Sequence, residues 1–236
     1  MSSWIAQGGL QIREDPTESC EADNGFCPGW IAENFGEYVD PFLEHVYLTV
    51  VAVAIGFAIS FTLAVIAYRR RWLINPVTQV TGILYTVPSV AAFFLLLPVT
   101  GRGKTTALIA LVAYVLLIIF RNVLTGLDNV PDETKDAGRG MGLTDRQLLW
   151  RVEVPLALPE IMAGLRIAVT TTVGLATLAF FAGAGGLGGQ IFADINFKSN
   201  VVVAGGLAVL LAAVLDGLIL LGQRAITPWT RAAAAR

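Results

Sequence analysis

Five long apolar runs dominate this sequence, and no other feature limits its possible folds as strongly. The runs cover residues 46–68, 73–98, 104–124, 161–183 and 200–223, and they contain very few charged side chains. A helix needs ~20 mostly apolar residues to cross the hydrocarbon core of a bilayer. The chain has 55% hydrophobic and only 14% charged residues, too few charges for a fully water-exposed surface. We therefore expect an all-α integral membrane protein with about five transmembrane helices within residues 45–224.

The second run is the least regular of the five, because Pro76, Pro88 and Pro98 interrupt it. Proline lacks a backbone N–H and bends or ends a helix. A break at Pro88 would divide the run into two crossings and bring the total to six. The run is short for two crossings, so we predict a single one.

Lysine and arginine are unevenly distributed between alternate flanks of the five runs. One set of flanks contains twelve of these residues, including Arg69, Arg70 and Arg71, and the other set contains four. Loops rich in Lys and Arg stay in the cytoplasm. The loop at residues 128–160 and the tail at residues 225–236 are therefore predicted to be cytoplasmic. The acidic tail at residues 1–44 is predicted to lie outside, and its charge argues against nucleic-acid binding.

Both cysteines, Cys20 and Cys27, lie in the acidic tail. A disulfide could persist there if the tail faces an oxidising compartment, and two unpaired thiols in a loop are the alternative. Two cysteines without neighbouring histidines do not make a zinc site, which usually needs four ligands. The single histidine, His45, stands at the edge of the first run, where we expect an interfacial side chain.

Two glycine motifs resemble nucleotide-binding motifs, but the residues around them argue against that function. Residues 103–105 read Gly-Lys-Thr, yet Pro98 replaces the earlier glycine of a phosphate-binding loop, and the predicted orientation places this segment outside. The segment Gly183-Ala-Gly-Gly-Leu-Gly188 follows a span rather than a strand, which predicts a tight turn or close helix packing. No nucleophile–base pair or metal-ligand cluster is recognisable, so we expect this chain to have no catalytic site and to bind no cofactor or metal.

The loop at residues 128–160 has more local order than a connector requires. A first short helix is expected after Pro131 and should end among the glycines of residues 138–142. A second short helix should begin with a capping box, in which Thr144 is followed three residues later by Gln147. Two short helices separated by glycines would form a knob on the cytoplasmic face.

The second of these helices is predicted to carry an apolar ridge. Leu148, Leu149 and Val152 recur at helical spacing. Pro155 is expected to end the helix, and Pro159 to restart the chain into the next span. The combination of cap, bend and ridge indicates a docking element for a partner protein rather than a solvated connector.

This loop resembles the EAA loop of bacterial ATP-binding-cassette (ABC) importer permeases. That motif reads Glu-Ala-Ala, three residues, Gly, nine residues and then Ile-x-Leu-Pro. Here Asp136-Ala137-Gly138 occupies the place of Glu-Ala-Ala, and Gly142 follows at the same spacing. Val152-Glu-Val-Pro155 then closes the pattern. Asp136 and Gly138 depart from the family's residues, which implies docking to a particular ATPase.

Further segments within residues 42–230 look like the glycine betaine/carnitine/choline branch of these permeases. They are Tyr85-Thr-Val-Pro-Ser89, Arg121-Asn122, Gly140-Met-Gly142, Pro155-Leu-Ala-Leu-Pro159, Ala163-Gly-Leu-Arg166 and the Gly183–Gly188 segment. The resemblance implies a type I importer permease of the MetI-like fold, with the 128–160 loop as its coupling helix.

The resemblance also implies the partners of the chain. Two permease subunits would pair as a homodimer or heterodimer in the bacterial cytoplasmic membrane. Two ATPase subunits, which carry ATP and Mg²⁺, would bind below them. An extracellular binding protein would deliver a quaternary-ammonium osmoprotectant. This chain would then be a non-catalytic subunit that surrounds the path and transmits the motion of the ATPases.

The residues expected to couple this loop to the ATPase lie on both short helices. They are Asp136, Ala137, Gly138, Arg139, Gly140, Gly142, Leu143, Leu148, Leu149, Val152 and Pro155. The three glycines would provide the bend, the leucines would make apolar contacts with the ATPase, and Asp136 and Arg139 would make polar ones.

The translocation path is harder to assign from the sequence. Tyr85, Pro88 and Ser89 are candidates because irregular backbone at membrane depth lies against protein or a water-filled cavity; a proline kink used only for packing is the alternative. Asp216 is a candidate because a carboxylate inside a span is costly, and an ion pair with a base such as Arg166 is the alternative.

Other functions remain compatible with these residues. An ABC permease for another small solute, such as an amino acid, shares the five-span plan. An ion-coupled secondary transporter would use carboxylates inside its spans and often has internal repeats, but only Asp216 qualifies and no repeat is visible. A non-transporting membrane anchor would use the loop to bind a regulator.

Overall fold

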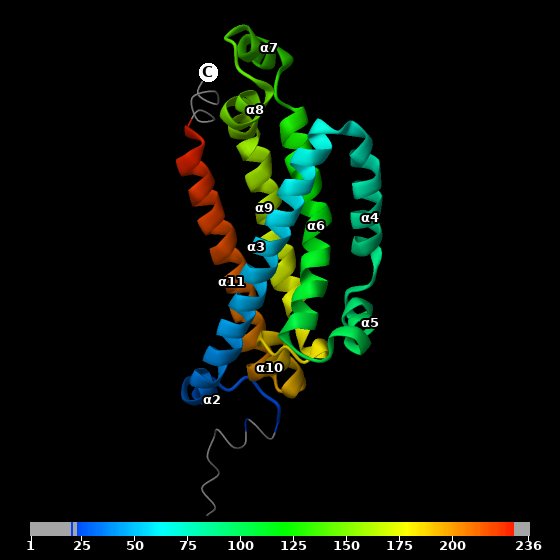
Figure 1. Cartoon of the computed structure of the whole chain (residues 1–236). Coiled ribbons are helices and arrows are strands. Elements are labelled where there is room, and N and C mark those ends of the chain that lie inside the picture. Colours follow the sequence, from blue (N-terminus) through cyan, green and yellow to red (C-terminus); the bar gives the residue numbers. More distant parts are fainter. Residues whose placement is uncertain (1–19, 21–22, 229–236) are drawn as a thin grey trace, which may run out of the picture.

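The computed structural model of the chain describes residue 20 and residues 23–228. Within these residues the fold is entirely helical (Figure 1). The elements are α2 (Pro28–Asn34), η1 (Phe35–Tyr38), α3 (Val39–Arg69), η2 (Arg71–Leu73), α4 (Ile74–Thr86), α5 (Ser89–Thr100), α6 (Lys104–Asp128), α7 (Asp132–Gly140), α8 (Asp145–Leu148), η3 (Leu149–Glu153), α9 (Val154–Ala176), η4 (Ala179–Ala182), α10 (Leu187–Ala193) and α11 (Lys198–Ile226). The prediction of an all-α membrane protein is confirmed.

Three helical stretches in the described part of the chain are long and apolar enough to cross a membrane. They are Pro28–Arg69, Lys104–Asp128 and Lys198–Ile226, and the bent pair α4–α5 makes a fourth if it is counted as one span. Helix α9, which contains most of the predicted run at residues 161–183, does not meet this test. It packs against α3, α6 and α11 and thereby occupies the centre of the bundle.

The second run, predicted as a single crossing interrupted by prolines, is sharply bent. Its two helices, α4 and α5, meet at an angle of 98°. Val87 is extended and Pro88 directly precedes α5, as expected of a residue before proline and of a ring that blocks helix continuation. The Tyr114 hydroxyl of α6 donates a hydrogen bond to the Val87 carbonyl. That bond satisfies a backbone group that the break would otherwise leave unpaired at membrane depth.

Small residues allow the central helices to approach closely. A Cβ added to Gly56 of α3 would lie 2.5 Å from the Val115 side chain of α6. A Cβ on Gly164 of α9 would overlap Asn122 of α6. Glycines at such contacts are typical of helix pairs in membranes, where packing rather than water exclusion drives association.

The N-terminal segment is folded rather than a free tail over its described residues. Cys20 and Cys27 form a disulfide. The Cys27 amide donates to the Ser199 hydroxyl at 2.7 Å, and the Tyr38 hydroxyl donates to the Asn200 side chain at 2.8 Å. These bonds hold α2 and η1 against the start of α11. The rest of the predicted acidic tail, residues 1–19 and 21–22, and residues 229–236 of the predicted C-terminal tail lie outside the described residues.

The glycine-rich segment after α9 forms a tight turn at the same end of the bundle as α2. Gly183, Gly185 and Gly186 all have positive φ, a backbone conformation that side chains disfavour. The Glu44 carboxylate accepts a hydrogen bond from the Gly186 amide at 3.2 Å and forms a 2.8 Å ion pair with Lys104. The turn is thus held between α3 and α6.

His45 is not the interfacial side chain that we expected. It is fully buried, and its Nε2 lies 3.0 Å from the carbonyl oxygen of Val173 in α9. Gly186 packs over its ring, because that position has no side chain of its own. The hydropathy of the neighbouring residues could not indicate this, because the partners of His45 come from distant parts of the chain.

Candidate functional site

The end of the bundle opposite the disulfide carries a two-helix knob formed by α7 and α8 (Figure 1). Helix α7 follows Pro131 and has Asp132 and Glu133 in its first turn, where negative charge favours a helix N-terminus. After Gly140 the chain turns at Gly142, whose φ is +83°. Of the three glycines expected to form the bend, only Gly142 has such a backbone; Gly138 and Gly140 lie within α7.

Gly138 has a packing role instead. A Cβ at this position would lie 2.6 Å from the Leu148 side chain of α8. The absence of a side chain therefore lets α7 and α8 pack directly on each other. The departure from alanine at Gly138 is explained by this contact.

The predicted capping box is present at the start of α8. The Thr144 amide donates to the Gln147 side-chain oxygen at 2.9 Å, and the Gln147 amide donates to the Thr144 hydroxyl at 3.4 Å. These reciprocal bonds pair two of the donors that a helix start leaves free.

The two prolines after α8 do not interrupt the helix as we predicted. The chain continues through the π-helical turn η3 into α9, with Pro155 in the first turn of α9 and Pro159 inside it. Proline inside a helix lacks the N–H of one backbone hydrogen bond, and its ring crowds the carbonyl of the preceding turn; the π turn that precedes Pro155 is wider than an α turn and interrupts the regular bonding pattern there. Helical backbone thus continues from α8 of the knob into α9.

The apolar ridge of the second helix points into the protein. Leu148 and Leu149 are buried in the chain itself, and Leu149 belongs to the same core cluster as Leu127 of α6. The prediction that these two leucines contact an ATPase is therefore wrong, because the helical spacing of apolar residues shows that a ridge exists but not what it packs against. The exposed large apolar side chains of this region are instead Met141, in the turn after α7, and Trp150, in η3.

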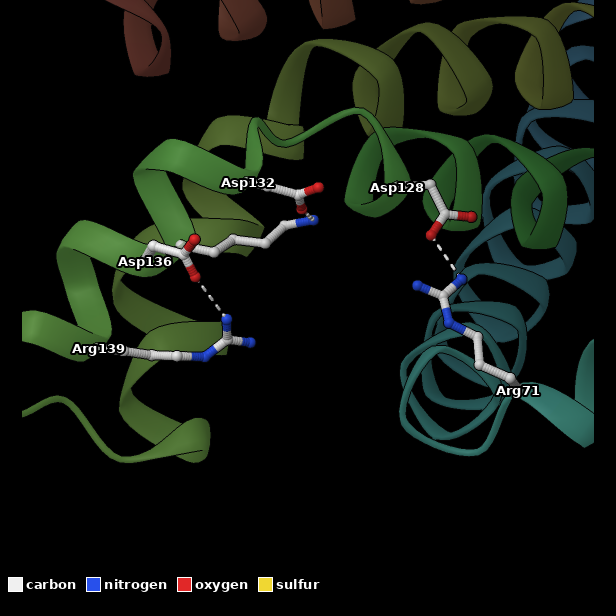
Figure 2. A network of polar contacts seen from close by, with 6 residues as sticks. Arg71, Asp128, Asp132, Asp136 and Arg139 are labelled. Carbon is white, nitrogen blue, oxygen red and sulfur yellow. Dashed lines mark hydrogen bonds and ion pairs between the residues drawn. The ribbon is translucent and has the colours of Figure 1, made fainter.

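The charged residues of α7 divide into an outer and an inner set. Asp136 and Arg139 are exposed and form an ion pair at 3.0 Å, so both remain available at the surface (Figure 2). Lys135 is buried, and its ammonium lies 3.2 Å from the Asp132 carboxylate. Burial by itself lowers the pKa of Lys135, but hydrogen bonds with Asp132 and Tyr68 outweigh it, and the pKa lies above its ordinary value.

Two basic residues that follow the first predicted span contact α6 and the knob. From the sequence alone, these residues served only to assign an orientation. Arg71 forms a 2.6 Å ion pair with Asp128 at the end of α6 (Figure 2). The Arg69 guanidinium lies 4.0 Å from the Asp145 carboxylate of α8 and donates to its backbone carbonyl. The basic run at residues 69–71 and the acidic side chains of the 128–160 loop were predicted to lie on the same side of the membrane, and this could have indicated such pairs.

The structure does not bring the candidate path residues together. Tyr85 lies on α4 just before the break at Pro88 and Ser89, and its ring packs edge-on against Tyr114 of α6 at 5.9 Å. Asp216 lies on α11, on the other side of the bundle (Figure 1).

Asp216 forms a two-pronged ion pair with Arg166 of α9. Arg166 Nε and Nη2 donate to the two carboxylate oxygens at 2.7 and 2.8 Å. Both side chains are about one-third exposed, in a hollow of about 290 Å³ that Ala163, Ile167 and Thr170 complete. A partly exposed ion pair inside a span favours contact with protein or water over contact with lipid.

Across the described ranges, residue 20 and residues 23–228, no group of three or more His, Cys, Asp or Glu side chains is arranged to hold a metal ion.

Fold and site together define a polytopic membrane protein with a compact two-helix docking element at one end. The chain belongs to the family of binding-protein-dependent transport system inner membrane components, which matches residues 37–230. It is therefore a permease component of a membrane transport system.

Relatives with assigned functions cover most of the chain. It is 35% identical over 201 residues to the glycine betaine/carnitine/choline transport system permease protein OpuCB of Bacillus subtilis, a match that covers 84% of this chain and 93% of that protein. It is 37% identical over 206 residues to the osmoprotectant import permease protein OsmW of Salmonella typhimurium, with 84% and 96% covered. Among solved structures, the inward-facing MetNI methionine ABC transporter matches with a TM-score of 0.69 and 26% identity, over 80% of this chain and 96% of that one.

Proposed function

We propose that this chain is the permease subunit of an ATP-driven importer for quaternary-ammonium osmoprotectants of the glycine betaine, choline and carnitine type. The observation that carries the substrate class is the similarity to OpuCB and OsmW, which extends over 84% of this chain and nearly the full length of both relatives. The solute would pass from an extracellular binding protein to the cytoplasm.

The assembly follows from the family. Two ATPase subunits would supply ATP and Mg²⁺ sites, and a second permease, identical or not, would complete the membrane part. This chain would hold no cofactor and hydrolyse no ATP. The twelve-to-four bias of Lys and Arg supports a cytoplasmic knob and an outer N-terminal disulfide.

The knob would dock into the ATPase through its exposed side chains. Met141 is 76% exposed in the turn after α7, Trp150 is 49% exposed in η3, and the Asp136–Arg139 pair is exposed on α7. An aromatic side chain and an arginine at the centre of a contact are common sources of binding energy. Leu143 and Val152 are half-buried and would contribute at the edge of the contact.

The path would involve the two irregular or charged places within the spans. These are the α4–α5 break with Tyr85, Pro88 and Ser89, and the hollow around Asp216. Cysteines introduced at Tyr85, at Ser89 and at Thr170, which lines the hollow around Asp216, should react with a water-soluble thiol reagent, and solute should protect them. If solute does not change the labelling of one of these cysteines, the residue at that position does not line the path.

Transport by the purified complex in proteoliposomes tests the proposal. We expect uptake of a radiolabelled betaine, choline or carnitine that requires ATP and the binding protein. Uptake that persists without ATP but stops with an uncoupler would establish an ion-coupled transporter, and uptake of only an amino acid would overturn the substrate class.

The coupling role has its own test in the same complex. Gly142→Asp would place a side chain on a backbone with φ of +83° and misplace the knob. We expect it to abolish solute-stimulated ATP hydrolysis, whereas Gly36→Asp, at an exposed and unstrained position in η1 with no neighbour within 4 Å, should retain it. Normal assembly and transport by Gly142→Asp would refute the assignment of the loop.

A further inference from the structure

At the end of the bundle that carries the disulfide, the glycine turn holds one carboxylate in place. Glu44 of α3 accepts a hydrogen bond at 3.2 Å from the Gly186 amide through its Oε2. A Cβ added to Gly185 would lie 2.1 Å from the same oxygen, so the turn accommodates the carboxylate because position 185 has no side chain. A backbone amide and a missing side chain thus position the Glu44 carboxylate.

The second oxygen of this carboxylate binds a cation. Glu44 Oε1 lies 2.8 Å from the ammonium of Lys104, the first residue of α6. The same ammonium lies 5.7 Å from the centre of the Tyr47 ring, within the distance at which a cation is attracted to an aromatic face. A carboxylate and an aromatic ring of α3 therefore attract one cation together.

All three side chains are accessible to solvent. The side chains of Lys104 and Glu44 are 50% and 36% exposed, and Tyr47 is 48% exposed. Exposed ion pairs are weak, because they order two flexible side chains and salt screens their charges. The Lys104 ammonium can therefore leave the carboxylate without a movement of the backbone, and another cation can take its place.

A carboxylate beside an aromatic face has the chemistry that binds a quaternary ammonium group. Such a cation has no N–H to donate, and proteins bind it over aromatic rings. The displaced Lys104 ammonium would then be free to pair with a carboxylate of the solute. Glycine betaine and carnitine carry a carboxylate, whereas choline does not, so this lysine can distinguish between the two kinds of solute.

We propose that Glu44 and Tyr47 form a site for the quaternary ammonium group of the solute, and that Lys104 occupies this site until the solute displaces it. The displaced Lys104 favours solutes that also carry a carboxylate. The inference rests on the proposed osmoprotectant function and goes beyond it, because it assigns residues of the permease to the choice between solutes. In the proposed orientation the site faces outward, where the solute arrives.

Chemical modification of lysine in the unaltered transporter tests the displacement. The purified permease–ATPase complex is treated by reductive methylation in choline chloride or in sodium chloride of equal concentration, and mass spectrometry follows each lysine. Choline should raise the methylation rate of Lys104 by about fivefold, which corresponds to the ~1 kcal/mol of an exposed ion pair. Lys198, exposed at the start of α11, is the control and should not respond.

An uncharged analogue separates the charge of choline from its shape. Dimethylbutanol, in which carbon replaces the ammonium nitrogen of choline, should leave the methylation rate of Lys104 unchanged. Equal rates for Lys104 in choline chloride and sodium chloride would overturn the proposal, and so would an equal effect of the uncharged analogue.

Binding of radiolabelled solute to the same complex measures the preference between solutes. Lys104→Gln should bind choline about fivefold more tightly, because the competing cation is gone. It should gain no affinity for glycine betaine, whose carboxylate loses its partner. Tyr47→Leu should weaken the binding of both solutes, and Lys198→Gln should change neither. An equal effect of Lys104→Gln on both solutes, or unchanged binding by Tyr47→Leu, would overturn the proposal.

These measurements need neither ATP nor the binding protein, so they are independent of the uptake experiment. Uptake of quaternary ammonium solutes without a response of Lys104 to choline would refute this site and leave the proposed function intact. A response of Lys104 without such uptake would support the site and refute the proposed function. If Lys104→Gln does not assemble, the methylation of the unaltered protein decides the question.

Discussion

At the scale of single residues, several close contacts in this fold lie at glycines, where an added Cβ atom would meet a neighbouring atom. Gly138 and Gly164 leave space for neighbouring side chains, which can shift to some extent. Gly188 is different because its neighbour is backbone: a Cβ there would overlap the carbonyl of Thr177. Backbone atoms in a packed helix end have little freedom to move, so this position should be the least tolerant of the three.

We predict that Gly188→Ala destabilises the protein by at least about 3 kcal/mol, the upper end of the usual cost of overpacking. Gly189→Ala provides the matched control, because its new methyl group would meet only the Phe180 Cβ at 3.9 Å, an ordinary contact. Thermal unfolding of both variants in detergent measures the difference. Equal melting temperatures for the two would contradict the close approach of α10 to Thr177.

At the scale of elements, the joint between α9 and α11 combines apolar packing with one ion pair. Helix α11 is largely exposed along its length, and the Arg166–Asp216 pair lies at its contact with α9. Removing one member of such a pair leaves the other charge without a partner inside the membrane, where a lone charge is unfavourable. The joint should therefore depend on both residues.

We expect Asp216→Asn to lower the yield of assembled complex, and the exchange Arg166→Asp with Asp216→Arg to restore it. Solute uptake then separates the two roles of the pair. If the pair lines the path, the exchanged protein should assemble but transport poorly, because the order of charges that the solute meets has changed. Full recovery of both yield and uptake would show that the pair only joins the helices.

At the scale of the whole molecule, the two ends of the bundle carry different structures. The disulfide, α2 and the glycine turn gather at one end, and the knob and the end of α11 gather at the other (Figure 1). Two different ends are expected of the proposed permease subunit, which would receive solute at one end and contact the ATPases at the other. The proposed orientation decides which end meets which partner.

Thiol labelling in whole cells can test this orientation. In the background without Cys20 and Cys27, a membrane-impermeant maleimide should label Asn196→Cys in intact cells, because this position is exposed at the disulfide end. Met141→Cys, exposed on the knob, should react only after the membrane is permeabilised. The reverse pattern would show that the chain is inserted the other way round.

Features that depend on neighbouring residues were predictable from the sequence alone. The apolar runs predicted the helices, Pro131 and the glycines predicted the extent of α7, and Thr144 with Gln147 predicted a helix cap. Each of these features is formed by residues within one continuous stretch of the chain. The same sequence could not predict whether Leu148 faces outward, whether Pro155 stops a helix, or that Lys135 is buried.

The tertiary structure decided those points because each depends on which distant element occupies the adjoining space. Leu148 turns inward because Gly138 leaves room for it, and the break at Pro88 is supported by a hydroxyl from α6. Asp216 finds its partner 50 residues away, and Arg69 at the end of α3 contacts Asp145 in the loop 76 residues further along the chain. The sequence by itself determined that this is a helical membrane protein with an ordered loop, and only the packing of distant segments decided how that loop is joined to the spans.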